Sequence, residues 1–184
     1  MIGLPKGYSL IDDDSSDIAQ KMQLLYDIFS SETWDENRSL DELIRLWPVW
    51  QKEKWYRGKW IVDSEWNYIG GINWRSGTAM IDEINERMTM DAFQKILDTY
   101  STTLADIFWI DNIFIKDWYR GHGLWHSLYV SLEKIAKTEW YTYIFLETKE
   151  AKPKLVERYM RLWFKKTGNF EVNEEIFVEL IKKI

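Results

Sequence analysis

A short glycine-containing segment, RGHGLW at residues 120–125, has the residue types of a phosphate-binding turn. Gly121 and Gly123 flank a histidine, and an arginine precedes them. The first turn of a helix has unpaired backbone N–H groups and the positive end of the helix dipole, so a glycine turn that leads into a helix can hold a pyrophosphate. Arg120 adds positive charge at the same place. The segment therefore predicts a phosphate-binding site.

The phosphate prediction depends on the elements on either side of this segment. Residues 106–115 are apolar at almost every position, which is typical of a central strand covered on both faces. Residues 124–137 carry apolar side chains at helical spacing and predict a helix packed on a sheet. Short glycine motifs occur by chance, so the strand–turn–helix setting is what gives this one weight.

The rest of the chain predicts alternating strands and helices without a linker or a repeat. Runs of β-prone residues predict strands at residues 8–11, 60–62, 68–74, 141–148 and 175–184. Helical spacing predicts helices at residues 18–29, from 39 until Pro48, at 90–100, and from 153 to about 166. This order predicts an α/β (α+β) chain with a mixed, mostly antiparallel central sheet of six or seven strands and helices on both faces. We expect residues 1–184 to form a single domain.

Composition narrows the class of protein. Hydrophobic residues make up 46% of the chain and charged residues 29%, as in soluble globular proteins. The absence of cysteine excludes disulfides and thiolate catalysis and suits a cytoplasmic location. No run of about 18 apolar residues and no basic leader are present, so we expect no membrane association. The net charge of -6 and the lack of a basic patch argue against a nucleic-acid partner.

The chain has 12 tryptophans, spread from Trp34 to Trp163 without a regular period. We expect most of them to lie in the core. Tryptophan also favours protein interfaces, because its ring buries a large area while its N–H keeps a partner. Some of the twelve could therefore mark contact with a protein partner or with a second copy of the chain.

The glycine segment resembles the signature of the GNAT superfamily of N-acetyltransferases. That signature is an arginine or glutamine, two residues, a glycine, one residue, and a glycine or alanine, and it falls on Arg120, Gly121, His122, Gly123, Leu124 and Trp125. The preceding IDNIFIKDWY is similar to the family's strand and its approach to the turn. The resemblance implies the acyl-CoA N-acyltransferase fold, whose sheet has a V-shaped splay between the strands at residues 106–115 and 141–148. Residues 106–137 carry the resemblance, and the element order extends it over most of the chain.

The resemblance also implies acetyl-CoA as the co-substrate. In the family, backbone groups of the central strand pair with the pantetheine arm, and N–H groups of the turn hold the pyrophosphate. Carried over, Ile113, Phe114 and Ile115 would hold the arm, and residues 120–125 would hold the pyrophosphate. The implied activity is transfer of an acetyl group to a primary amine of a small molecule or a protein.

Two positions depart from the family pattern. Trp125 stands where the signature has a small residue, and its indole should lean back toward the helix N-terminus. We expect the ring to close the turn against a phosphate, or else to rotate away and pack beside the cofactor. Phe164 stands four residues before Gly168, where many members have a tyrosine that protonates the departing thiolate. Phenylalanine has no proton to give, and Tyr159 lies more than one helical turn earlier.

A general base is expected on or beside the central strand, because attack on a thioester requires a neutral amine. Asp111 occupies a position where relatives often carry a glutamate, and Glu147 ends the next strand. Either could serve, directly or through water. The alternative is that both are ordinary polar residues at strand ends.

Two further interpretations concern metals and the loss of activity. His122 and His126 are four residues apart, a spacing that could present two metal ligands, but no third ligand is identifiable and we expect no metal site. Trp125, Phe164 and the tryptophan excess also fit a catalytically inactive protein of the same fold that acts through protein–protein contacts. An intact segment from Arg120 to Gly123 favours the enzyme.

Overall fold

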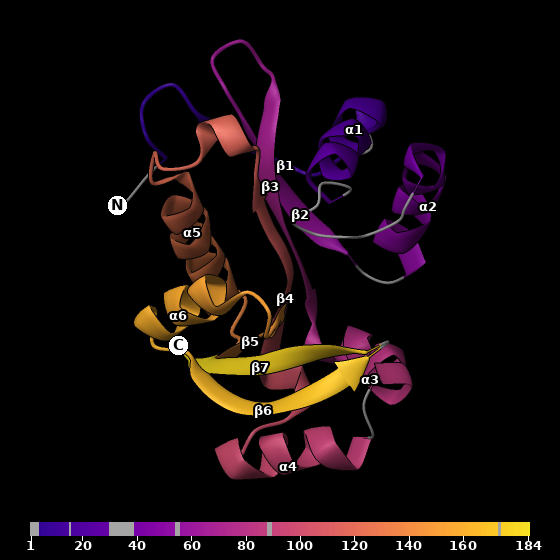
Figure 1. The fold of residues 1–184 in the computed structure, drawn as a ribbon, viewed down its shortest axis with the longest axis vertical. Helices are drawn as coiled ribbons and strands as arrows, with labels where there is room; N and C mark the ends of the chain where they lie inside the picture. Colours follow the sequence, from indigo (N-terminus) through magenta and orange to yellow (C-terminus); the bar gives the residue numbers. More distant parts are fainter. Residues whose placement is uncertain (1–3, 15, 30–38, 54–55, 88–89, 173) are drawn as a thin grey trace. The chain divides into compact units, whose positions relative to one another are not determined.

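The computed structural model describes residues 4–14, 16–29, 39–53, 56–87, 90–172 and 174–184 (Figure 1). Its strands form one sheet of seven in the order β1-β2-β3-β4-β5-β7-β6. They are β1 Ser9–Asp12, β2 Arg57–Val62, β3 Tyr68–Ser76, β4 Ile107–Ile115, β5 Tyr143–Lys149, β6 Lys165–Val172 and β7 Glu175–Lys183. The helices are α1 Ile18–Phe29, α2 Leu40–Glu53, α3 Ile81–Arg87, α4 Met90–Tyr100, α5 Leu124–Thr138 and α6 Pro153–Arg161.

The pairing of β4 with β5 has the predicted direction. These two strands are parallel, whereas the pairs β1–β2, β2–β3, β5–β7 and β6–β7 are antiparallel. The parallel pairing runs from Ile107 opposite Tyr143 to Ile110 opposite Leu146 and ends there, although both strands continue. Pairing limited to the start of both strands is what a splayed pair requires. The mixed, mostly antiparallel sheet predicted from the sequence is confirmed.

The chain forms two compact units, and the first contains the residues up to Trp74 together with Asn112–Leu132. Its core lies between helices α1 and α2, which lie side by side (Figure 1), and strands β2 and β4. The buried residues of this core are Met22, Leu24, Leu25, Ile28, Leu43, Trp47, Trp60 and Phe114. Lys21 is also fully buried here, and its Nζ is 3.0 Å from Oδ1 of Asp14.

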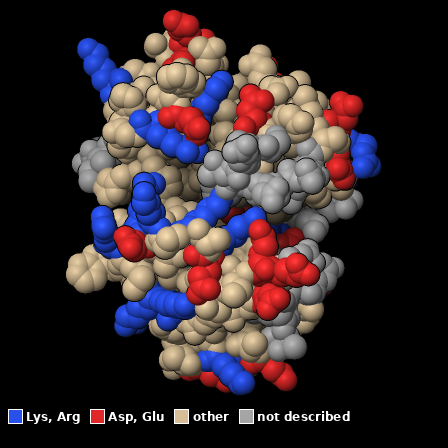
Figure 2. All heavy atoms as spheres, viewed as in Figure 1, with Lys and Arg blue, Asp and Glu red and all other residues tan. Residues whose placement is uncertain are grey.

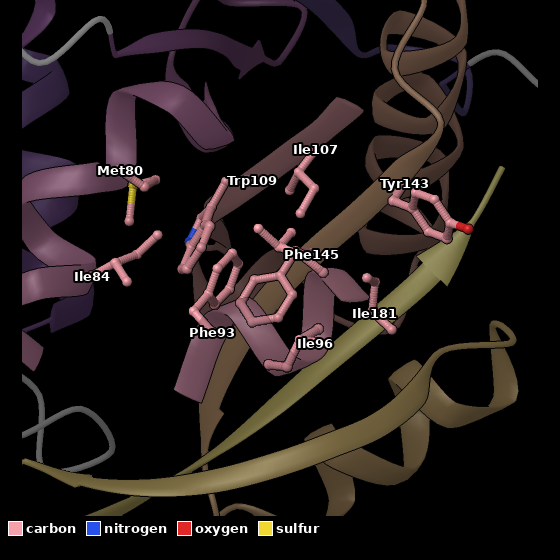
Figure 3. Packing of buried hydrophobic residues seen from close by; sticks show 10 residues of the cluster. Met80, Ile84, Phe93, Ile96, Ile107, Trp109, Tyr143, Phe145 and Ile181 are labelled. Carbon is pink, nitrogen blue, oxygen red and sulfur yellow. The ribbon is translucent and has the colours of Figure 1, made fainter. Parts of the chain in front are cut away.

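The second unit contains Arg75–Asp111 and Glu133–Ile184. Its core, shown in Figure 3, packs α4 and α3 against β4, β5 and β7. Phe93 of α4 packs against both Trp109 and Phe145, with ring centroids 5.6 and 5.2 Å away. Because Trp109, Phe145 and Ile181 occupy neighbouring strands, this row of side chains defines one buried face of the sheet.

Two predicted helix ends are wrong. Helix α2 continues through Pro48 to Glu53, although an interior proline costs about 3 kcal/mol. Packing offsets that cost, because Trp47 makes edge contacts with both Trp50 and Trp60. Helix α6 ends at Arg161 rather than near residue 166, because the chain turns at Trp163 (φ 72°) and enters β6, a strand that was not predicted.

The tryptophans divide between core and surface among the described residues. Four are buried: Trp47, Trp60, Trp74 and Trp109. Four others are well exposed: Trp66, Trp118, Trp140 and Trp163. The expectation that most lie in the core is therefore wrong for the described residues. The four exposed rings do not contribute to the buried core. None of the helices in the described residues is both long and apolar enough to span a bilayer.

Candidate functional site

The turn from Arg120 to Trp125 connects β4 to α5, as the sequence predicts (Figure 1). Gly121 and Gly123 have φ values of 87° and 76°, a region that favours glycine. Among the described residues, no atom beyond the chain neighbours lies within 4 Å of the place where a Cβ would stand on either glycine. The glycines therefore serve the backbone conformation and leave that side of the turn open.

The first turn of α5 presents backbone N–H groups at this opening. Helical hydrogen bonding begins where the N–H of Ser127 donates to the carbonyl oxygen of Gly123 at 3.0 Å. The N–H groups at the start of an α-helix have no acceptor within the helix. A helix N-terminus that follows an exposed glycine turn is an arrangement that suits an anion.

Arg120 is fixed beside this turn. Its Nε donates to the carbonyl oxygen of Ile115 at 3.1 Å, and its Nη2 lies 2.8 Å from Oδ1 of Asp117. The side chain is still 48% exposed. The guanidinium is thus held at the end of β4 with part of its hydrogen-bonding capacity facing solvent.

The indole of Trp125 packs along the helix. Its ring is nearly parallel to that of Tyr129, with an interplanar angle of 9° and centroids 6.1 Å apart. No Trp125 atom is within 4 Å of the Cβ positions of Gly121 and Gly123. The ring therefore leaves the space beside both glycines open, and closure of the N–H groups of the turn by this ring stays a prediction.

The three strand residues expected to hold the pantetheine arm have different surroundings. Phe114 is buried, and its ring makes edge contacts with Trp60 and Phe29. Ile115 is buried, and its carbonyl oxygen accepts the hydrogen bond from Nε of Arg120. Ile113 is half-buried. The end of β4 is therefore joined to the turn by one hydrogen bond.

Asp111, the first candidate base, is held by Arg75. Nε of Arg75 donates to both carboxylate oxygens at 3.1 Å, and Nη2 lies 2.5 Å from Oδ1. The same guanidinium binds Glu83 of α3 through Nη1 at 2.7 Å and Nη2 at 2.9 Å. The Arg75 and Asp111 side chains are only 2% and 7% exposed. Sequence reasoning missed Arg75, whose signal was a lone cation at the end of an apolar strand.

Glu147, the second candidate base, is half-buried near the end of β5 and faces another carboxylate. In the antiparallel register its Cα partner is Glu179 of β7. Glu179 is 6% exposed, and burial raises its pKa to about 6. Sequence reasoning missed this residue, although a glutamate inside the apolar run FVELI was visible.

Comparison with known proteins finds similarity in structure but none in sequence. No protein-family model and no curated protein matches the chain by sequence. In structure it is similar to a mutant form of the spermidine N-acetyltransferase SpeG from Vibrio cholerae, with 15% identity, a TM-score of 0.65, and coverage of 97% of this chain and 95% of that one. An N-acetyltransferase from Staphylococcus aureus Mu50 matches with 13% identity, a TM-score of 0.65, and coverage of 96% and 98%. The chain has the GNAT fold.

The dodecameric form of the Vibrio cholerae enzyme is also similar, with 16% identity and a TM-score of 0.64 over 97% of this chain and 95% of that one. These low identities show the GNAT fold alone. The structural similarity confirms the fold class that the sequence predicts.

The position of the missing tyrosine belongs to the core of this GNAT fold. Phe164 is buried and makes an edge contact with Tyr159, with centroids 5.5 Å apart. Burial raises the pKa of the Tyr159 phenol well above its usual range. Both rings are thus packed structural residues.

Charge and metal-binding groups complete the description. Figure 2 shows basic side chains scattered among acidic ones on the displayed face rather than gathered into a stripe. His122 and His126 are both exposed. In the part of the chain that the structure describes, no three His, Asp or Glu side chains are arranged to hold a metal ion.

The Arg75 ion pairs generate a stability prediction. Arg75→Met should lower the free energy of unfolding by about 3–5 kcal/mol, because it leaves two largely buried carboxylates without a cation. Arg161→Met is the matched control, since Arg161 is exposed and lies 3.7 Å from Glu157. The control should change the free energy by no more than about 0.5 kcal/mol. Urea unfolding of the three proteins measures both values, and equal losses would contradict the role given to Arg75.

Glu179 generates a prediction about pH. Its pKa is about 6 in the folded protein against 4.5 for an ordinary glutamate, so the folded state keeps a proton that the unfolded state releases. This contribution to stability is complete below about pH 4.5 and is lost as the pH rises through about 6. Glu179→Gln should therefore stabilise the protein more at pH 7.5 than at pH 4.5, relative to the native chain. Urea midpoints at the two pH values provide the measurement, and a pH-independent difference would contradict it.

Proposed function

We propose that this protein is an N-acetyltransferase that transfers the acetyl group of acetyl-CoA to a primary amine. The observation that supports the proposal best is the open turn at the start of α5, where two positive-φ glycines and the N-terminus of the helix lie next to Arg120. Such a turn fits a pyrophosphate because both its donors and its charge suit an anion. The similarity to N-acetyltransferases of known structure supports the same activity.

The binding roles follow from these positions. Residues Arg120 to Trp125 would hold the pyrophosphate of acetyl-CoA, and Ile113, Phe114 and Ile115 would line the pantetheine arm. Acetyl-CoA supplies an acyl group activated as a thioester. The chain's own contribution is to orient the two reactants and to accept the proton that the amine loses.

Of the two proposed bases, Glu147 is the better placed. Both oxygens of Asp111 are engaged by Arg75, so proton transfer to Asp111 would require that ion pair to open. Glu147 is partly accessible near the end of β5. We therefore assign Glu147 as the proton acceptor and give Asp111 a positioning role through Arg75.

The lack of cysteine supports a cytoplasmic setting.

Two observations favour a second function. Trp66, Trp118, Trp140 and Trp163 expose large rings, and Phe164 stands where the family has its tyrosine. Exposed tryptophans are common at protein interfaces. The alternative is a catalytically inactive GNAT-fold protein that binds a partner protein or a second copy of itself.

The deciding experiment is a titration of the pure protein with acetyl-CoA, followed by detection of free thiol with a panel of primary amines. Binding together with amine-dependent thiol release supports the acetyltransferase. Binding without release by any amine, or no binding, supports the inactive alternative.

Arg120 provides a direct test of the cofactor site. Arg120→Ala should weaken acetyl-CoA binding by about 1–3 kcal/mol, because it removes a charge-assisted contact to a phosphate. Arg161→Ala removes a more exposed arginine outside the turn and should leave the affinity unchanged. Calorimetric titration measures the affinities, and circular dichroism should show native folding for both variants. An unchanged affinity in Arg120→Ala would place the cofactor elsewhere.

Trp125 provides a second test, because its ring packs on Tyr129 and leaves the glycine side open. For that reason, Trp125→Ala should leave the acetyl-CoA dissociation constant within about threefold, which corresponds to about 0.7 kcal/mol. The melting temperature should fall through lost aromatic packing. A gain of tenfold or more would show that the indole closes the site, and a comparable loss would show that it packs on the ligand.

A further inference from the structure

Trp140 and Trp163 stand at positions where neither the backbone nor burial explains a tryptophan. They follow the ends of α5 and α6, and their φ values are 67° and 72°. Glycine is the residue that this left-handed conformation favours after a helix, and a bulky side chain there is unusual. The two indoles are also 90% and 82% exposed. A strained backbone and an exposed ring at the same residue, twice, indicate a role outside the packing of the fold.

The sheet brings the two loops that carry these tryptophans to the same edge. Strands β5 and β6 are both antiparallel to β7, which lies between them, so both begin at the edge where β7 ends. Trp140 lies three residues before β5, and Trp163 lies two residues before β6. Neighbouring strands are about 4.8 Å apart, so the starts of β5 and β6 are separated by roughly 10 Å. The C-terminus of the chain lies at this edge beside the start of β6 (Figure 1).

Both loops reach this edge from the same face of the sheet. Helix α5 connects β4 to β5, and α6 connects β5 to β6, which runs parallel to β5. Crossovers between parallel strands are right-handed, and these two proceed in the same direction across the sheet. The two helices therefore cover one face, whereas α4 packs against the other.

Cationic side chains gather around the two tryptophans. Residues 133–143, 157–165 and 181–184 meet at this edge and carry seven Lys or Arg side chains and three Glu side chains. The formal charge of these segments is +4, in a chain whose total charge is -6. The cations are Lys134, Lys137, Arg158, Arg161, Lys165, Lys182 and Lys183, and the acids are Glu133, Glu139 and Glu157. They are far apart in the sequence, so only the fold assembles this local excess of positive charge.

The acids at this edge do not balance the cations. Glu133 is shared by two lysines, with Nζ of Lys137 at 3.0 Å and Nζ of Lys182 at 2.6 Å. Lys165 and Lys183 are exposed and make no ion pair within the described part of the chain. Positive charge next to two exposed indoles is therefore left facing solvent.

We propose that this edge, the Trp140–Trp163 surface, binds an acidic segment of a partner protein that carries large apolar side chains. Tryptophan and arginine are enriched where protein interfaces have most of their binding energy, and cations select an acidic partner. A nucleic acid fits less well, because its phosphates continue beyond this edge over a chain that is otherwise acidic. The inference deepens the second proposed function by giving it a surface and the chemistry of its partner. It holds whether or not the protein transfers acetyl groups.

The test selects peptides from a display library of random sequences on the immobilised full chain. We expect the enriched peptides to contain an excess of Asp and Glu together with large apolar residues. Calorimetry then measures their dissociation constants, which should rise with salt because exposed ion pairs are screened. Single-stranded oligothymidylate is titrated in parallel as the nucleic-acid probe.

Two sets of variants locate the binding. Trp140→Gly and Trp163→Gly should each weaken peptide binding by about tenfold or more without lowering the melting temperature, because glycine suits a positive φ. Trp66→Gly is the matched control, since Trp66 has φ 65° and is 69% exposed but lies in the turn between β2 and β3. Lys165→Glu and Lys183→Glu should weaken binding by about tenfold. Lys95→Glu makes the same change of charge on α4 and should leave the affinity unchanged.

Several outcomes would overturn the inference. They are no enriched peptide, enrichment of neutral or basic sequences, equal affinities in the native chain and Trp163→Gly, or an equal loss in Trp66→Gly. Tighter binding of oligothymidylate than of any peptide would assign the surface to a nucleic acid. Self-association that Trp163→Gly abolishes would assign it to a second copy of the chain.

Thiol release from acetyl-CoA, measured on the same proteins, separates this inference from the acetyltransferase. Peptide binding with these variant effects but without thiol release keeps the Trp140–Trp163 surface and rejects the acetyltransferase. Thiol release without peptide binding does the reverse.

Discussion

The parallel pairing of β4 with β5 is the constraint from which the candidate cofactor site follows. Parallel neighbours cannot be joined by a tight turn, so a crossover helix must lie between them in the chain. Helix α5 is that crossover. Its N-terminus therefore follows the carboxyl end of β4 within a few residues, and the glycines of the turn make the change of direction with positive φ values. The position of the helix N-terminus beside the glycine turn is thus a direct result of topology.

Two buried charged groups on one face of the sheet in the second unit, Arg75 and Glu179, have opposite surroundings. Arg75 is buried with two carboxylates that occupy both edges of its guanidinium, and the arrangement satisfies its hydrogen bonds. Glu179 is also buried, at 6% exposure, and none of the described residues forms an ion pair with it. Loss of Arg75 should lower the stability of the protein, whereas neutralising Glu179 should raise it. A group whose removal stabilises a protein is a candidate for function, because function is a common reason for keeping an unfavourable interaction.

Most of the elements could be predicted because their side chains repeat at the period of the structure they form. The long apolar strand at β4, the stripe along α5 and the stripe along α4 all depend on local spacing, and their predicted and observed ranges differ by one residue or less. The failures lie where distant contacts outweigh local preference. Proline at position 48 should end a helix, but Trp47 packs against Trp60, which is distant in sequence, and the helix continues. Strand β6 is polar along much of its length, and only its pairing with β7 makes it a strand.

The sequence by itself determined the glycine turn, the helix that follows it, and the order of the strands and helices along the chain around them. These depend on backbone conformation and on periodic burial, both of which are encoded within a few neighbouring residues. Only the tertiary structure decided which groups surround each carboxylate. Asp111 and Glu147 look alike in the sequence, yet the first is held by Arg75 and the second faces Glu179. The protonation and role of a carboxylate depend on charges within a few ångströms, and the residues that carry those charges are brought together only when the sheet forms.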